Sequence, residues 1–137
     1  MVETIKETFY EKNIAKDVKE PFSLALKLKE EMGSFGKVEE KENKIFTTEE
    51  GSVLVLKFDA IKSIDNVTEV IFSFNIEADI KRINITIIGF VLSTFDEKDK
   101  TFSDFYKLEL YPEILEDAKK IIEKTAQKIE NIIENWK

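Results

Sequence analysis

The chain contains no cysteine and no histidine. Without cysteine it has no disulfide, no thiolate metal site and no cysteine nucleophile. Without histidine it also lacks the most frequent zinc ligand and the side chain that most often acts as a general base near neutral pH. There is no phosphate-binding glycine motif, and carboxylate pairs are as common as an acidic composition predicts. We therefore expect no enzyme activity, no catalytic residues, no cofactor and no metal site.

Arginine is almost missing as well. Arg82 is the single arginine among 21 basic residues, and the formal net charge is −7. Proteins that read nucleic acid are usually basic and use arginine clusters on the phosphates, so we expect no nucleic-acid partner. Any charged partner should be basic. Few glycines or prolines, together with many Ile, Lys and Glu residues, are typical of a protein from a thermophile.

Long apolar runs are missing too. No window approaches the roughly 18 apolar residues of a membrane span, and the first residues carry no basic and then apolar leader. These features predict a cytoplasmic protein without membrane insertion. The 137 residues are 42% hydrophobic, include 11 Phe and contain no Pro/Gly/Ser-rich linker, so we expect one domain over residues 1–137 with one sizeable core.

Two long runs in the middle of the chain predict a β-hairpin. Apolar residues alternate with polar ones over residues 68–80, a period of two that indicates a strand with one buried face. A second run over residues 83–95 begins in the same way and then becomes apolar on both phases. The polar residues 79–82 form the turn between them. Gly89, where the pattern changes, predicts a bulge or bend.

The segments before this hairpin predict further strands and one short helix. Residues 1–11 alternate weakly and are rich in charge, as a protected edge strand is. Residues 22–32 carry apolar side chains at helical spacing, with a stop expected at Gly33. The pattern of residues 35–48 predicts a solvated strand or hairpin, and that of residues 53–64 predicts another strand.

The C-terminal residues 112–136 change to a period of 3.6, which predicts one long amphipathic helix opened by Pro112. At about 1.5 Å per residue this helix is as long as the predicted strands, so it can lie along the whole sheet. The predicted fold class is α+β, with an antiparallel sheet of four to five strands packed under the long helix in two layers. The apolar stripe of the helix comprises Leu115, Ala118, Ile122, Thr125, Ile129, Ile132 and Trp136.

The strands carry a surplus of apolar residues on the face that a single helix does not cover. Such a face is covered by another part of the chain, by a partner subunit or by a bound client. A small aromatic group after the hairpin either plugs an edge of the core or forms an exposed binding surface. The candidate residues for client binding or a subunit interface are Val53, Val55, Ile61, Ile71, Phe102, Phe105 and Tyr106.

Three segments resemble the SecB-like protein-export chaperones. Residues 66–78 (NVTEVIFSFNIEA) are similar to the third strand of that family, residues 111–115 (YPEIL) to the start of its main helix, and residues 9–14 (FYEKNI) to its opening strand. Residues 22–32 look like an insertion. The resemblance implies a holdase chaperone linked to protein export, which forms a homo-oligomer and holds unfolded polypeptide clients in long hydrophobic grooves.

A helix-grip domain is the alternative that the sequence leaves open. In that arrangement a curved antiparallel sheet wraps a long C-terminal helix around a cavity for a lipid or another hydrophobic small ligand. The two alternatives differ beside Ile122 and Ile129, where a helix-grip fold leaves a closed cavity and a SecB-like fold packs the helix tightly on the sheet.

Overall fold

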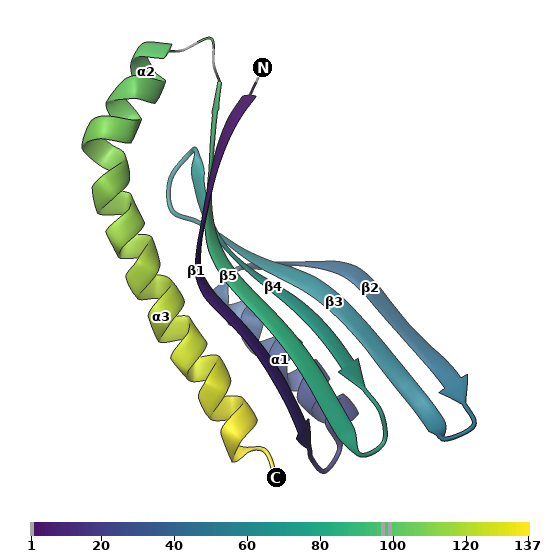
Figure 1. Ribbon diagram of the computed structural model, residues 1–137. Coiled ribbons are helices and arrows are strands. Elements are labelled where there is room, and N and C mark those ends of the chain that lie inside the picture. The colour runs from purple at the N-terminus through teal and green to yellow at the C-terminus, as the bar shows by residue number, and fades with distance from the viewer. Residues whose placement is uncertain (1, 97, 99) are drawn as a thin grey trace.

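The computed structural model describes residues 2–96, 98 and 100–137. Its five strands form one antiparallel sheet in the order β1-β5-β4-β3-β2 (Figure 1). About 38% of the chain is helix and 50% is strand, so the α+β prediction is confirmed. Along the chain the elements are β1 (Val2–Asp17), α1 (Pro21–Phe35), β2 (Lys37–Thr48), β3 (Gly51–Ser63), β4 (Thr68–Ala78), β5 (Arg82–Asp96), α2 (Lys100–Phe105), the π-helical segment η1 (Tyr106–Leu110) and α3 (Tyr111–Asn135).

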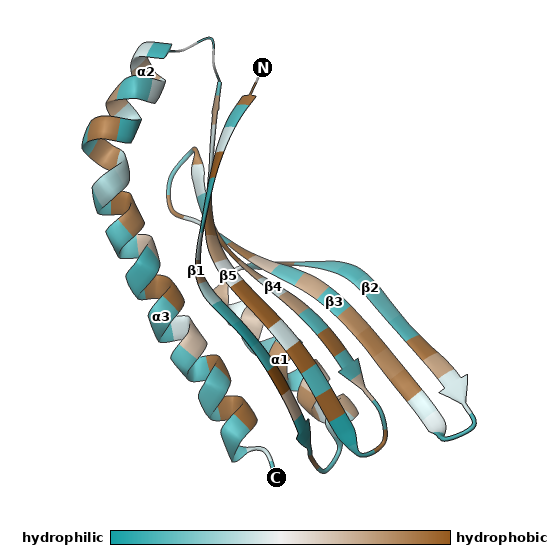
Figure 2. Ribbon diagram, viewed as in Figure 1, coloured by the Kyte–Doolittle hydropathy of each residue, from teal (hydrophilic) through white to brown (hydrophobic). Residues whose placement is uncertain are grey.

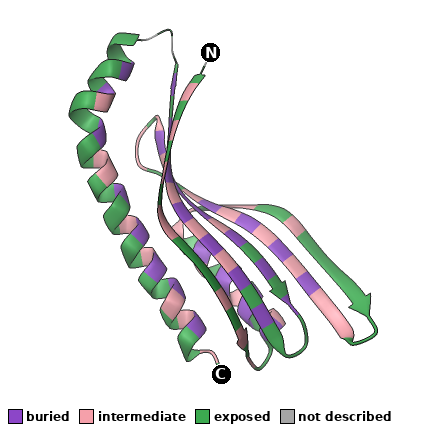
Figure 3. Ribbon diagram, viewed as in Figure 1, coloured by how far each residue is buried: buried purple, intermediate pink, exposed green. Residues whose placement is uncertain are grey.

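The long helix α3 and the shorter α1 both pack on the same face of the sheet. Leu24 and Leu28 of α1 and Ile122 of α3 join one core with the alternate apolar residues of β3, β4 and β5. Figures 2 and 3 show the alternation along these strands as bands of hydropathy and of burial. The sheet therefore has one covered face and one face without a helix. Within the described part of the chain, no helix combines the length and the apolarity needed to cross a bilayer.

The predicted hairpin is present, and its turn is held by Asp79. The Asp79 carboxylate accepts hydrogen bonds from the backbone N–H groups of Lys81 at 2.8 Å and Arg82 at 2.7 Å. These backbone donors lower the pKa of Asp79, because they stabilise its charged form.

A bulge or bend was predicted at Gly89, and the bulge that the structure shows lies on the neighbouring strand β1. The β4–β5 register runs through Gly89 without a break, whereas the β1–β5 register shifts between Thr8 and Tyr10, opposite Gly89. Gly89 has a packing role: a Cβ there would lie 3.0 Å from the Phe72 ring and 3.1 Å from Ile122. Glycine at this position lets the Phe72 ring and Ile122 of α3 pack closely over β5.

The end of α1 and the buried stripe of α3 both differ from the prediction. α1 does not stop at Gly33 but continues to Phe35, whose ring packs edge-on against Phe72 with centroids 5.4 Å apart. Tertiary packing thus overrides the glycine stop signal. In α3 the buried line drifts from the predicted stripe, because Thr125 and Ile132 are only partly buried. The buried residues of this line are Ala118, Ile122, Ala126, Ile129 and Ile133.

The aromatic group after β5 is helical, although the sequence shows no clear period there. It forms α2 and the π-helical η1, which lead directly into α3 (Figure 1). A search for a 3.6-residue period misses such a segment, because a π-helix repeats less often along the chain. Tyr106 is buried in a second, smaller core with Phe95 and Tyr111.

Candidate functional site

The face of the sheet without a helix, called here the open face, brings together four of the predicted site residues. Val53, Val55 and Ile61 of β3 are partly buried there. Ile71 of β4 lies on the same face and is 7% exposed. The β3–β4 register places Ile61 directly opposite Ile71. Side chains opposite one another on adjacent strands are in contact range, so these two residues form one surface.

Strand β5 adds residues to the open face that the sequence analysis did not include among the candidate site residues. Phe90 pairs with Ile71, which makes Ile61, Ile71 and Phe90 an unbroken row across three adjacent strands. This is the apolar row. Ile88 and Leu92 flank Phe90 on the same face of β5. The sequence indicated them through the second half of residues 83–95, where successive residues are all apolar. Such a run is typical of a strand with two apolar faces.

A second, smaller apolar area lies at the other end of β3. Phe46 of β2 pairs with Val53, and Val55 follows on the same face. We call Phe46, Val53 and Val55 the hairpin patch. Val55 and Ile61 are six residues apart on one strand, a separation of about 20 Å.

Polar side chains fill the space between the apolar row and the hairpin patch. A hollow of about 310 Å³ lies there, lined by these polar side chains and also by Phe58, Phe74 and Ile88. Ser73 donates a hydrogen bond to Asp59 at 2.5 Å, Asn13 donates to Thr86 at 2.7 Å, and the Lys57 ammonium lies 3.4 Å from Glu42. Hydroxyls, amides and mixed charges therefore separate two apolar areas on one face. We refer to this region as the polar belt.

The three aromatic candidates lie elsewhere. Tyr106 is 2% exposed, and its hydroxyl donates to Asp65 at 3.0 Å and is hydrogen-bonded to Thr68. Tyr106 therefore plugs the core and offers no surface to a client in this conformation. Phe102 and Phe105 are 43% and 52% exposed. They lie on α2, which packs with η1 and α3 on the covered side of the sheet, so they do not join the open face.

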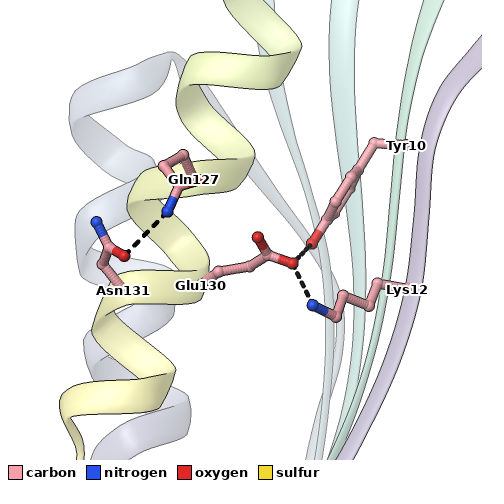
Figure 4. A network of polar contacts seen from close by, with 5 residues as sticks. All are labelled: Tyr10, Lys12, Gln127, Glu130 and Asn131. Carbon is pink, nitrogen blue, oxygen red and sulfur yellow. Dashed lines mark hydrogen bonds and ion pairs between the residues drawn. The ribbon is translucent and has the colours of Figure 1, made fainter.

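A cluster of three titratable groups joins α3 to β1. Glu130 accepts a hydrogen bond from the Tyr10 hydroxyl at 3.0 Å and forms an ion pair with Lys12 (Figure 4). Burial and the Glu130 carboxylate raise the pKa of Tyr10. The pKa of Glu130 is lowered, chiefly by the hydrogen bond from Lys12. These shifts keep Tyr10 neutral and Glu130 charged, which suits a structural contact between helix and strand.

A groove of about 280 Å³ runs between α1 and α3. Its apolar lining includes Phe35, Ile129 and Ile132, and three lysines, Lys62, Lys124 and Lys128, stand beside Glu31 and Ser34 at its rim. By contrast, the interior is packed where α3 meets the sheet, because Ile122 is fully buried and lies against Gly89. The space that a helix-grip fold would place beneath Ile122 is therefore filled at this level.

Among the described residues, no three Asp or Glu side chains converge as a metal site would require. Comparison with known proteins adds no family: no protein-family model matches the chain, and no curated protein is similar to it.

Proposed function

We propose that the chain is a non-catalytic protein that binds extended, apolar polypeptide on its open face, in the manner of a holdase chaperone. The observation that carries this proposal is the apolar row: Ile61, Ile71 and Phe90 lie side by side, while both long helices pack on the other face. Ile61 and Phe90 are partly exposed, and Ile71 between them is 7% exposed. Accessible apolar side chains that lie side by side on a face without a helix support an interaction site there.

The pattern of the open face suits a peptide better than a compact ligand. An extended chain carries apolar side chains and also backbone N–H and C=O groups that need hydrogen-bond partners. The apolar row and the hairpin patch suit the side chains, and the polar belt between them suits the backbone. Their separation of about 20 Å corresponds to roughly six residues of extended peptide. The net charge of −7 favours basic clients and limits self-aggregation.

The test is an aggregation assay with an unfolded client diluted from denaturant. The wild-type protein is expected to suppress light scattering near stoichiometric ratio and without nucleotide. The double variant Val55→Lys/Ile61→Lys is expected to lose most of this suppression, because it places two charges among the apolar side chains. Both positions are partly exposed, so the lysines reach solvent and the fold survives, which Ile71→Lys would not guarantee.

The matched control is Leu108→Lys, which adds a lysine at an apolar residue of η1 that is 76% exposed. This control should hold client as the wild type does. If the wild type gives no suppression even in large excess, the proposal is wrong. If Leu108→Lys abolishes suppression while Val55→Lys/Ile61→Lys keeps it, the client binds the α2–η1 segment and not the open face.

A second candidate function follows from the groove between α1 and α3. Its volume lies at the lower end of ligand sites, and an apolar lining under three lysines suits a small amphipathic anion such as a fatty acid. In this second candidate function the ligand binds in a groove between two helices and not in the internal cavity expected of a helix-grip domain. We also propose that the protein acts in the cytoplasm, which fractionation of host cells tests.

A further inference from the structure

Strand β2 is the edge of the sheet farthest from α3 (Figure 1). No other described strand pairs with its outer side, so its backbone donors and acceptors there face solvent. The other edge, β1, is different. Lys16 of β1 reaches the Ile133 carbonyl of α3 at 3.0 Å, and Lys12 reaches Glu130, so α3 lies along that edge. The exposed edge of this sheet is therefore β2, which is drawn largely as exposed in Figure 3.

The charges of β2 are balanced, although the chain as a whole is acidic. Residues 37–46 contain three lysines and three glutamates, and so carry no net charge. Charged side chains on an edge strand usually prevent it from pairing with strands of unrelated sequence. The order of charges in β2 is instead self-complementary when the strand is turned end to end.

Opposite charges of two paired strands meet only if they lie on the same face of the sheet. A bulge in β2 makes this possible. The β2–β3 register shifts between Glu40 and Glu42, so one extra residue, Lys41, is inserted there. Lys41 lies 3.4 Å from Glu39, and Glu42 lies 3.4 Å from Lys57, which is on the open face. Lys41 and Glu42 therefore point to the same face although they are neighbours in sequence.

A two-fold axis normal to the sheet keeps each side chain on its own face, so only residues of one face come to lie opposite one another. An axis between two neighbouring residues sets them opposite one another, and in a regular strand these two side chains point to different faces. Lys41 and Glu42 point to the same face because of the bulge, so an axis between them is possible. With this axis, Glu39 lies opposite Lys44 of the second copy, and Lys41 lies opposite Glu42. On the covered face, Val38 lies opposite Ile45 of the second copy.

We propose that two copies of this chain pair antiparallel through their β2 strands, about a two-fold axis between Lys41 and Glu42, and so form one continuous ten-stranded sheet. This inference goes beyond the proposed function and does not depend on it, because it uses a different surface.

The proposed register is the one that avoids like charges. A shift of two residues in one direction brings Glu39 opposite Glu42 of the second copy, and a shift in the other direction brings Lys41 opposite Lys44. Like charges directly opposite one another on adjacent strands are destabilising, so the charges select a single alignment. Each aligned dimer has four complementary pairs, two of Glu39 with Lys44 and two of Lys41 with Glu42.

Pairing also covers apolar side chains that are exposed in the single chain. Ile45 is 65% exposed and Phe46 is 48% exposed at the free end of β2. Leu26, which is 53% exposed, precedes Lys29 by three residues on α1, and Lys29 forms an ion pair with Glu40 of β2. Residues three apart share one side of a helix, so Leu26 lies toward the β2 edge. A second copy docked there removes all three from water.

The experiment is a charge exchange followed by sedimentation or native mass spectrometry. The wild type is expected to be a dimer. Glu39→Lys alone places lysine opposite lysine in both symmetry-related pairs, and Lys44→Glu alone places glutamate opposite glutamate. Each single variant is expected to weaken the dimer roughly 30-fold, since two attractive pairs become repulsive. Lys44 is exposed and Glu39 is partly exposed, so each variant should keep its fold, which circular dichroism checks.

Two rescues distinguish β2 pairing from a general effect of charge. The double variant Glu39→Lys/Lys44→Glu restores both pairs and should be a dimer again. An equimolar mixture of the two single variants should form heterodimers, because each supplies the charge that the other lacks. The control Lys119→Glu, on the exposed side of α3, should remain a dimer.

A monomeric wild type at high protein concentration would overturn the proposal, and so would a dimer whose mass is indifferent to both single variants. Failure of the mixture to form heterodimers would also overturn it. The Val55→Lys/Ile61→Lys variant, which tests client binding, leaves β2 intact and should stay dimeric. Client binding and dimerisation can therefore fail separately.

Discussion

At the residue scale, two glycines near the end of α1 have opposite roles. Gly33 lies inside the helix, and a Cβ added there would have no atom within 4 Å. Gly36 follows the helix, and a Cβ there would lie 2.1 Å from the backbone carbonyl oxygen of Ile61. Gly36 is extended, so backbone conformation does not explain it. The close approach of the start of β2 to β3 requires the missing side chain.

This difference gives a paired prediction. Gly33→Ala should stabilise the fold by about 0.5–1 kcal/mol, because alanine loses less backbone entropy in a helix. Gly36→Ala should destabilise it by roughly 1–3 kcal/mol, because β2 must move away from β3. Urea unfolding of both variants measures the two free energies. Changes of the same sign in both variants would contradict this account of α1 and β2.

The site residues show how far single positions can be predicted from sequence. Alternation placed Val53, Val55, Ile61 and Ile71 on one face correctly, because a strand has a strict period of two. Tyr106 was harder to assign, because its burial depends on a hydroxyl contact with Asp65, 41 residues away in the chain. No local pattern carries that information.

At the scale of elements, α3 is fixed to β1 by polar contacts as well as by its buried stripe. Tyr10 and Lys12 bind Glu130 in the C-terminal third of the helix. At its C-terminal end, the Trp136 indole N–H donates to the Lys19 carbonyl at 2.8 Å, and Lys16 donates to the Ile133 carbonyl. A cation at the free carbonyls of a helix C-terminus also interacts favourably with the helix dipole.

The contact at Glu130 predicts a pH dependence. The pKa of Glu130 is lowered below its ordinary value of 4.5, so its contribution to stability is present above that pH and is lost as the pH falls through the lowered pKa. Glu130→Gln keeps an acceptor for Tyr10 but loses the ion pair with Lys12. It should cost roughly 1 kcal/mol at neutral pH, and the difference from wild type should shrink in acid.

Thermal or urea unfolding of wild type and Glu130→Gln across the acid range measures this difference. Glu134→Gln, one turn later and exposed, is the control and should differ little from wild type at any pH. A wild-type advantage that stays constant down to strongly acid pH would show that the Glu130 charge does not contribute to holding α3 on β1.

Strands and long helices were predictable from period, but their partners were not. The sequence indicated a strand near each observed strand and both long helices, since hydrophobic period depends on neighbours along the chain. It left residues 35–48 as a strand or hairpin, and it ended the first strand at residue 11, whereas β1 continues to Asp17. It did not indicate that β1 pairs with β5, nor that α1 and α3 share one face, because those contacts join distant segments. A bulge or bend was predicted at Gly89, whereas the bulge lies on β1, because a bulge depends on how β1 and β5 pair.

At the scale of the whole molecule, the helices on one face leave two surfaces of the sheet available. One is the open face with its apolar row, and the other is the outer edge of β2. Pairing of two copies through β2 about an axis normal to the sheet places both open faces on the same side. The proposed dimer thus presents two open faces side by side, and a client long enough to engage both binds more tightly because its second contact is intramolecular.

The central claim is that the open face binds extended polypeptide. Methyl NMR of isoleucine-labelled protein, titrated with an unfolded apolar peptide, tests this claim most directly because isoleucines mark each surface. We expect shifts at Ile61, Ile71 and Ile88 on the open face and none at the buried Ile122. Peptide shifts confined to Ile121 and Ile132 of the groove between α1 and α3, or no shifts at any isoleucine, would contradict it.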